Sequence, residues 1–237
     1  MELPDLDPIL SFIIAAHTAK SSTLVVGVTG GVAVGKSTFS DDLARLLNLE
    51  TGLTVVVVAS DGFLHRNSVL EEMGISDRKG FPESYDARAI EQFLTDVRSG
   101  SPTFVPVYDH HTYDITDTVI ELLPADMVLF EGVNALQFAE HLDIGLYLHA
   151  DEPVMRAWFV ERTRGLREAA RSEYSPFFDP WLDVPDDVFL AMVNGAWEMV
   201  NLPNLVDHIE PTQTLAHAVI EWEADHGIRV ITFRESL

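Results

Sequence analysis

The residues Gly30 to Thr38 constrain the fold of this chain more than any other part of its sequence. They read GGVAVGKST and match the pattern GxxxxGK[ST], whose glycines let successive backbone N–H groups converge on phosphate oxygens. An apolar run from Leu24 to Thr29 precedes the motif, and a helical pattern from Lys36 to Leu47 follows it. The sequence therefore predicts a strand, a phosphate-binding loop and a helix whose N-terminus faces an anion.

Every residue of this loop is a candidate for contact with the phosphates of a nucleotide. The set is Gly30, Gly31, Val32, Ala33, Val34, Gly35, Lys36, Ser37 and Thr38. Lys36 is expected to reach the β- and γ-phosphates of ATP, and the Ser37 hydroxyl is expected to bind Mg²⁺. The alternative is a glycine-rich turn with a chance lysine. The chain has only three lysines, and one of them stands where the loop needs a cation, so we favour the phosphate-binding loop.

The rest of the chain alternates between apolar β-rich runs and helical patterns, which is typical of βαβ units on a parallel sheet. Short apolar runs predict strands over Leu24 to Thr29, Thr54 to Ala59, Met127 to Phe130 and Gly145 to His149, with weaker candidates at Leu205 to Ile209 and Ile228 to Phe233. Helical periodicity covers Lys36 to Leu47, Ala87 to Val97, Glu152 to Ser172, Asp186 to Val200 and Thr214 to His226. Leu64 to Ser84 and Gly100 to Thr118 are expected to be long functional loops.

These patterns place the chain in the α/β class. With the phosphate-binding motif they predict a P-loop NTPase fold, in which a central and mostly parallel sheet is flanked by helices. A length of 237 residues with 47% hydrophobic residues is sufficient for one large core. We therefore expect a single P-loop domain over residues 1–237, with a helical lid and acceptor-binding part at about residues 152–204.

Composition restricts the partners of the chain. The 15 Lys and Arg against 38 Asp and Glu give a formal net charge of −23, which disfavours nucleic acids and anionic membranes and favours small molecules. Adaptation to high salt is one interpretation of this charge, and an ordinary acidic protein is the other. No apolar run approaches the ~20 residues that cross a bilayer, and the N-terminus is acidic, so we expect a cytoplasmic location. Because the chain has no cysteine, a metal would need oxygen or imidazole ligands.

Two carboxylates follow predicted strands directly, and α/β proteins bind ligands beyond the carboxyl ends of their parallel strands. Asp61 comes after the run that ends at Ala59, and Glu131 comes after the run that ends at Phe130. Phosphoryl transfer to a hydroxyl needs a carboxylate that accepts the proton, and oxygen atoms around Mg²⁺. We assign Asp61 as the base and Glu131 as the acid on the metal side. The alternative for each is a capping or turn carboxylate.

One helical pattern carries five of the 15 positive charges, namely Arg156, Arg162, Arg164, Arg167 and Arg171. Three of them share a face with Glu168, and exposed i,i+3 and i,i+4 ion pairs explain that face, which comprises Arg164, Arg167 and Arg171. Arg162 instead lies on an apolar stripe formed by Met155, Trp158, Phe159 and Leu166. A buried and unpaired guanidinium is costly, so Arg162 predicts a phosphate clamp on a closing lid, with a buried ion pair as the alternative.

Several further segments form a series that identifies a family. In chain order they are Asp61 to His65 (DGFLH), Lys79 to Asp86 (KGFPESYD), Pro106 to His110 (PVYDH), Glu131 to Gln137 (EGVNALQ), Trp158 to Arg162 (WFVER) and Asn201 to Leu205 (NLPNL). With these motifs the chain resembles bacterial type I pantothenate kinase, within the superfamily of uridine kinases and phosphoribulokinases. The resemblance runs from about Leu24 to about Thr212.

The resemblance implies ATP-dependent phosphorylation of the primary hydroxyl of pantothenate, which is the first step of coenzyme A biosynthesis, and a homodimer. It implies that Lys36 binds phosphates, that Ser37 approaches Mg²⁺, that Asp61 is the base and that Arg162 contacts the transferring phosphate. It also places Tyr108, His110 and Asn204 against pantothenate.

Pantothenate has a carboxylate, an amide and two hydroxyls, so its pocket should combine polar groups with apolar walls. Tyr108, His110 and Asn204 would supply the polar groups. Phe178, with Phe177 and Trp181, would supply apolar walls. The alternative for all of these residues is packing in the core or in a loop.

Two positions depart from the family pattern. Phe159 stands where the family commonly has tyrosine, so one hydroxyl contact with the substrate is missing. Asp41 stands where the family carries an arginine that helps to bind the phosphates of coenzyme A. Because a carboxylate repels a phosphate, we expect feedback inhibition by coenzyme A to be weak.

Two other functions remain open on the sequence alone. The first is another small-metabolite kinase of the same superfamily, acting on uridine or a sugar acid, and the two departures favour it. The second is a nucleotide-dependent switch that transfers no phosphate to a metabolite. A GTPase switch is disfavoured because Ala19, Gly35 and Arg78 precede the three lysines, so the chain has no Asn-Lys-x-Asp motif.

Overall fold

A six-stranded sheet forms the centre of the computed structural model, which describes residues 6–234. The strands are β1 (Leu24–Gly30), β2 (Val55–Ala59), β5 (Met127–Glu131), β6 (Ile144–His149), β7 (Ala218–Trp222) and β8 (Ile228–Phe233). They lie in the order β2-β5-β1-β6-β7-β8, and all neighbours are parallel except β7 and β8. The predicted mostly parallel sheet is confirmed.

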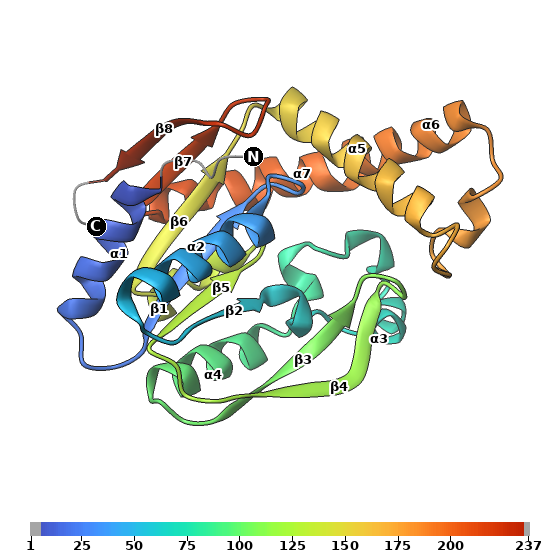
Figure 1. Ribbon diagram of the computed structural model, residues 1–237. Coiled ribbons are helices and arrows are strands. Elements are labelled where there is room, and N and C mark those ends of the chain that lie inside the picture. The colour runs from blue at the N-terminus through green and yellow to red at the C-terminus, as the bar shows by residue number, and fades with distance from the viewer. Residues whose placement is uncertain (1–5, 235–237) are drawn as a thin grey trace.

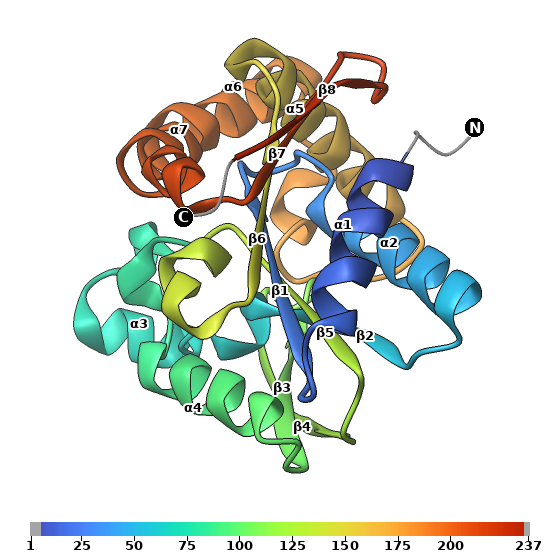
Figure 2. The ribbon, with the colours of Figure 1, turned by 90° about the vertical axis from the view of Figure 1, so that its left-hand side faces the viewer.

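Helices cover both faces of this sheet (Figures 1 and 2). On one face α1 (Asp7–Thr18) and α2 (Lys36–Thr51) bury Ile13 and Leu43 in the same cluster as Leu129 of β5. On the other face α4 (Ala87–Arg98) buries Phe93 against Phe130. Leu129 and Phe130 point to opposite faces because strand side chains alternate, so both layers need an unbroken apolar strand. The predicted helices over residues 36–47 and 87–97 are confirmed, and α1 is an addition to them.

A second, two-stranded sheet lies beside the main one. β3 (Thr103–Asp109) and β4 (Asp114–Leu122) pair as an antiparallel hairpin, with an irregularity between Pro106 and Tyr108. The expectation of a loop from Gly100 to Thr118 is therefore wrong. Pro106 and the many polar residues hide the alternation of this hairpin, whose second strand is largely exposed. The other expected loop contains the short helix α3 (Asn67–Met73).

The C-terminal region contradicts two further predictions. Leu205 to Ile209, expected as a strand, is helical, because its buried residues Leu205 and Ile209 are four positions apart and share one helix face. Thr214 to His226, expected as a helix, contains β7, whose Ala218 and Ile220 are fully buried between β6 and β8. Burial on both faces of a strand removes the alternation that distinguishes a strand from a helix in sequence.

Two long helices project away from the sheet (Figure 1). We call residues 152–196, which comprise α5 (Glu152–Ala169), a connecting loop and α6 (Asp186–Ala196), the arm. The arm has its own small core, formed by Ala170, Phe178, Phe189 and Val193. Beyond α6 the chain stays helical from Trp197 to Ile209, including α7 (Leu202–Asn204). None of the helices among residues 6–234 is both long and apolar enough to span a membrane.

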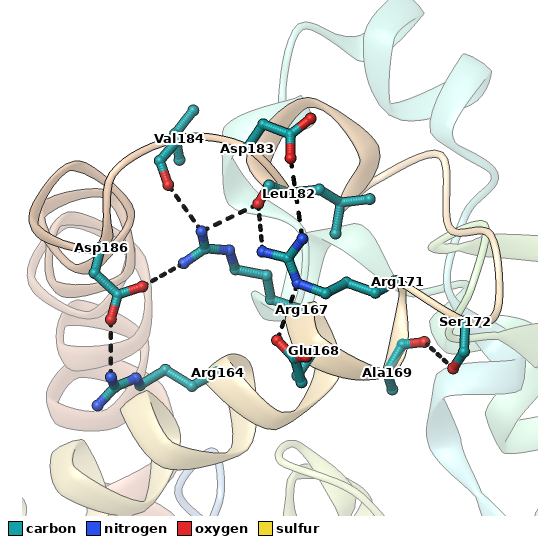
Figure 3. Close-up of polar contacts among 10 residues, drawn as sticks. All are labelled: Arg164, Arg167, Glu168, Ala169, Arg171, Ser172, Leu182, Asp183, Val184 and Asp186. Carbon is teal, nitrogen blue, oxygen red and sulfur yellow. Dashed lines mark hydrogen bonds and ion pairs between the residues drawn. The ribbon is translucent and has the colours of Figure 1, made fainter.

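Buried Arg167 joins the two helices of the arm (Figure 3). Its guanidinium donates to Asp186 at 2.8 Å and to the carbonyl oxygens of Val184 at 2.8 Å and Leu182 at 3.3 Å. It also lies 4.4 Å from the ring centroid of Phe189. The prediction that Arg167 belongs to a solvated face is therefore wrong, although the predicted i,i+3 pair of Arg171 with Glu168 is present at 3.0 Å.

Replacing Arg167 by Met should lower the free energy of unfolding by about 2 kcal/mol, because the carbonyl groups of Leu182 and Val184 lose a charged donor. Arg164→Met is the matched control, since Arg164 is exposed and pairs with the same carboxylate at the surface. It should cost at most about 0.5 kcal/mol. Urea denaturation followed by circular dichroism measures both losses. Equal losses in the two variants would contradict a buried role for Arg167.

Candidate active site

The phosphate-binding loop joins β1 to α2 and presents backbone donors to one end of the sheet. Gly30 has a φ of 150°, and a Cβ atom on it would lie 2.4 Å from the carbonyl oxygen of Leu148 in β6, so only glycine fits. Gly35 has a φ of 90° and turns the chain into α2. No side chain of the described residues caps this helix, so the N–H groups of its first turn are available to an anion.

Lys36 is the first residue of α2 and folds back over the loop. Its Nζ atom donates to the carbonyl oxygen of Gly31 at 2.9 Å. Burial lowers the pKa of Lys36, while the negative charges of Glu131 and Asp61 oppose that shift. The ammonium group is thus held over the loop, with the charges of two carboxylates acting on it. A lysine that binds the terminal phosphates of a nucleotide needs this location.

Glu131 ends β5 directly beside the loop. In the sheet it pairs with Val28 of β1 on one side and with Ala59 of β2 on the other. Its Oε1 atom accepts a hydrogen bond of 2.8 Å from the Ser37 hydroxyl. Burial raises the pKa of Glu131, and the charge of Lys36 and the bond from Ser37 lower it in part. A buried carboxylate and a hydroxyl therefore form one pair of oxygen ligands at the phosphate end of the site.

Asp61 follows β2 on a short helical turn, Ser60–Phe63. A Cβ atom on the next residue, Gly62, would lie 2.3 Å from the carbonyl oxygen of Pro106, so glycine allows this turn to approach β3 closely. The Oδ1 atom of Asp61 accepts a hydrogen bond of 3.2 Å from the Tyr85 hydroxyl. Burial raises the pKa of Tyr85, and the charge of Asp61 raises it further, so Tyr85 remains a donor.

A cavity of about 510 Å³ opens above the phosphate-binding loop. Residues from the loop, from α5 and from the turn between β7 and β8 line it, namely Ala33, Gly35, Lys36, Ser37, Thr38, Trp158, Glu161, Arg162 and His226. The rings of Trp158 and His226 stack with centroids 4.2 Å apart and planes 16° apart. The cavity therefore combines phosphate-binding groups at one end with an aromatic wall.

Arg162 lies about midway along α5 and is exposed rather than buried. Within residues 6–234 it forms no ion pair with a carboxylate, which removes the buried ion pair as an explanation of this residue. Its charge lowers the pKa of Lys36, so the two cations are electrostatic neighbours across the cavity. The predicted burial fails because the stripe on α5 faces the open cavity at this point instead of a packed layer.

The residues predicted to contact the acceptor surround the loop between α3 and α4. The Tyr108 and His110 rings, on β3 and just after it, have centroids 5.1 Å apart. Asn204 lies on α7, and its Nδ2 atom donates to the carbonyl oxygen of Gly80 at 2.9 Å. The Oδ1 atom of the same side chain is buried and has no hydrogen-bond partner in the described part of the chain. Such an atom is an acceptor that a ligand hydroxyl could satisfy.

Phe178 occupies a different place from these polar residues. It is 2% exposed and packs in the core of the arm with Phe189 and Val193. Its ring also meets that of Tyr113 at 6.2 Å, and the exposed Phe177 stacks on Tyr113 at 4.1 Å. The arm thus reaches the β3–β4 hairpin through aromatic rings, and direct contact of Phe178 with a substrate stays a prediction.

No group of three or more His, Cys, Asp or Glu residues within residues 6–234 is arranged to hold a metal ion. The oxygen pair of Ser37 and Glu131 is the donor set nearest the phosphate-binding loop. Magnesium in phosphoryl-transfer sites takes few protein ligands and completes its shell with phosphate oxygens and water. The donor set therefore fits Mg²⁺ bound together with a nucleotide.

Comparisons with known proteins agree with this geometry. Residues 25–171 match the model of the phosphoribulokinase / uridine kinase family. The chain is 36% identical over 230 residues to a pantothenate kinase of Lactococcus lactis subsp. cremoris, covering 91% of this chain and 74% of the relative. It is 38% identical over 226 residues to a pantothenate kinase of Rhodopseudomonas palustris, covering 89% and 71%. This chain belongs to the pantothenate kinase family.

Among solved structures, D-glycerate 3-kinase from Cryptococcus neoformans has the same fold, with a TM-score of 0.72 over 97% of this chain and 99% of that chain. Because the two sequences are only 13% identical, this similarity supports the fold and nothing about the substrate. The predicted P-loop fold is confirmed. As a member of the pantothenate kinase family, the protein is a phosphotransferase that acts on an alcohol group.

The two departures from the pantothenate kinase pattern occupy different surroundings. Phe159 is half-buried and packs against Trp197 with ring centroids 5.6 Å apart. Asp41 is exposed on α2, and its charge raises the pKa of Glu131. Asp41 therefore adds negative potential close to the phosphate-binding end of the site.

The sequence patterns do not predict three of the residues that line the cavity, Trp158, Glu161 and His226. The pattern of α5 places Trp158 on an apolar stripe, and His226 lies in the turn of a hairpin whose first strand has a helical sequence pattern. Finding them requires the pairing of β7 with β8, which carries His226 to α5. The sequence signal that could have found this turn is Asp225-His226-Gly227, a typical turn composition between two apolar runs.

Proposed function

We propose that this protein transfers the γ-phosphoryl group of ATP to the primary hydroxyl of pantothenate, the first step of coenzyme A biosynthesis. The observation that carries the proposal is the meeting of three groups at one end of the sheet. These are the phosphate-binding loop with Lys36, the Ser37–Glu131 oxygen pair, and Asp61 beside the β3 wall that bears Tyr108. The choice of pantothenate as the acceptor rests on the pantothenate kinases to which the chain is similar.

Asp61 is proposed to accept the proton of the pantothenate hydroxyl. The Tyr85 hydroxyl engages its Oδ1 atom, and no hydrogen bond within residues 6–234 engages Oδ2. Fixing one carboxylate oxygen orients the other toward a substrate, and a carboxylate in hydrogen-bond reach of the attacking hydroxyl is what the transfer needs. Tyr85 would thus orient the base without reacting itself.

Ser37 and Glu131 would hold Mg²⁺ against the terminal phosphates of ATP, and the ion would neutralise charge that develops there. Lys36 and the N–H groups of the loop would bind the same phosphates from the protein side. Arg162, which has no carboxylate partner in the described chain, would meet the phosphoryl group from the arm. The arm would then serve as the lid of the site.

For the acceptor, we propose that Tyr108, His110 and Asn204 contact pantothenate. The buried, unpartnered Oδ1 atom of Asn204 supports a bond from a substrate hydroxyl. Phe178 would add an apolar wall to the pantothenate pocket from the arm, where its ring contacts the ring of Tyr113. We also retain a homodimer, which the family resemblance implies, and a cytoplasmic location, which the sequence composition favours, as proposals.

The proposed reaction is tested by ATP turnover with Mg²⁺ and pantothenate, uridine, glycerate or no acceptor, with Lys36→Ala as the blank. Turnover should depend on pantothenate. Asp61→Asn should lower this turnover by about 10²- to 10⁴-fold, because it removes the general base. Asp77→Asn, an exposed carboxylate on a nearby turn, is the matched control and should keep full activity. If only another acceptor supports turnover, that compound and not pantothenate is the substrate. If Asp61→Asn keeps full activity, Asp61 is not the general base.

Arg162→Ala should reduce turnover by about 10²-fold and leave ATP affinity within about threefold, because a group that meets the transferring phosphoryl acts on the transition state. Arg164→Ala is the control on the same helix, where the side chain pairs with Asp186. Steady-state kinetics and equilibrium nucleotide titration separate the two quantities. A large loss of ATP affinity at unchanged turnover would make Arg162 a nucleotide-binding residue instead.

Coenzyme A should inhibit the protein weakly, because the carboxylate of Asp41 repels its phosphates. Asp41→Arg reverses the local charge and should create or strengthen inhibition that competes with ATP. Initial rates over a matrix of ATP and coenzyme A concentrations measure this effect. Competitive inhibition of the unmodified protein at low micromolar coenzyme A would disprove the role given to Asp41.

A further inference from the structure

Lys79 is a half-buried cation that the proposed reaction does not use. It lies between two short helical turns, Ser76–Arg78 and Pro82–Ser84, on the loop that leads to α4. Within residues 6–234 it forms no ion pair, although the whole chain carries 38 Asp and Glu. Because burying an ammonium group is costly, its remaining contacts must compensate.

The contacts of Lys79 converge on the acceptor side of the site. Its Nζ atom donates to Asn67 Oδ1 at 2.6 Å and to the carbonyl oxygen of Tyr113 in the turn of the β3–β4 hairpin. The same atom lies 5.0 Å from the centroid of the Tyr108 ring, within the range of a cation–π interaction. One ammonium group therefore contacts both the strand and the turn of the hairpin.

The neighbouring residue extends this junction to the other side of the site. The carbonyl oxygen of Gly80 accepts hydrogen bonds of 2.9 Å from both Asn134 and Asn204. Asn134 follows β5, and Asn204 lies on α7. Lys79 and Gly80 thus connect the hairpin with the segment after β5 and with α7. The hairpin and α7 carry Tyr108 and Asn204, which contact the acceptor in the proposed function.

We propose that Lys79 is a positioning residue that fixes the Tyr108 ring and the hairpin turn against the acceptor, and so sets the affinity for the acceptor. The inference rests on the proposed function and adds a residue to it. Lys79 acts through Tyr108, since its ammonium donors are directed to Asn67 and Tyr113 and its charge faces the ring. A residue of this kind affects ground-state and transition-state binding alike, and therefore KM more than kcat.

The test is steady-state kinetics of Lys79→Met with pantothenate and ATP varied separately. The KM for pantothenate should rise about tenfold, the size expected for loss of a partly desolvated cation–π contact. The KM for ATP and kcat should each stay within about twofold. Arg88→Met is the matched control, because Arg88 is an exposed cation on α4 with no ion pair among the described residues, and all three constants should be unchanged.

Two further variants separate positioning from a general effect on folding. Lys79→Arg keeps the charge over the ring and should recover part of the pantothenate affinity. Lys79→Gln keeps polar atoms for Asn67 and Tyr113 but loses the charge, and should resemble Lys79→Met. If Lys79→Met does not fold, the Gln variant carries the test, and a wild-type KM for pantothenate in that variant overturns the proposal.

A double variant tests whether Lys79 acts through Tyr108. In a Tyr108→Leu background, Lys79→Met should have no further effect on the KM for pantothenate, because the ring it positions is gone. A further tenfold rise there would overturn the proposal and make Lys79 an independent contact. If the wild-type protein shows no pantothenate-dependent turnover, the proposed function itself fails. If wild-type turnover is present and Lys79→Met has an unchanged KM, only this inference fails.

Discussion

The burial of Lys36 beside the carboxylates Glu131 and Asp61 is the interaction on which the rest of the site depends. Burial disfavours the charges of Lys36 and Glu131, and the opposite charge of each offsets part of that cost for the other. Their meeting requires the register of three parallel strands, in which Glu131 stands between Val28 and Ala59. A slip of one residue would turn Glu131 to the other face of the sheet, so the apolar layers that fix the register also fix the site.

The positive charges that form no ion pair are concentrated around the proposed site. Most Lys and Arg residues form ion pairs, and the exceptions among residues 6–234 are Lys36, Lys79, Arg88, Arg162 and Arg234. Three of these, Lys36, Lys79 and Arg162, lie around the proposed site. With a net charge of −23 the protein repels anions over most of its surface, so cations that form no direct ion pair give the site a local field that attracts anions. Because the other Lys and Arg residues are mostly held in ion pairs, an anionic ligand is attracted mainly to the proposed site.

The parts that sequence could predict are those in which local chemistry determines structure. The glycines at 30 and 35, the helix after them and the apolar strands follow from conformational freedom, periodicity and burial, and the structure has them. The errors arise where tertiary context overrides pattern. β7 is buried on both faces and has no alternation, and β4 is exposed and polar. The pattern of α5 predicts a solvated Arg167 because its partner Asp186 lies on another helix. The site residues at strand ends could be located from topology, whereas Lys79 and His226 required contacts between distant segments.

The arm is attached at both ends, and this attachment explains how an exposed arginine can have a defined position. At its base Met155 packs against the loop so closely that a Cβ atom on Gly31 would lie 2.6 Å from its sulfur, and Trp158 stacks on His226. Toward its tip the Ser175 hydroxyl donates to the carbonyl oxygen of His111 at 3.0 Å, beside the stacked Tyr113 and Phe177 rings. Arg162 lies between these attachments. The base contact is part of the main hydrophobic core, which includes Met155 and Trp158, whereas the contact at the tip joins the arm to the hairpin at the surface. The core contact thus fixes the start of α5, and with it the place of Arg162 beside the loop, although the Arg162 side chain itself is exposed.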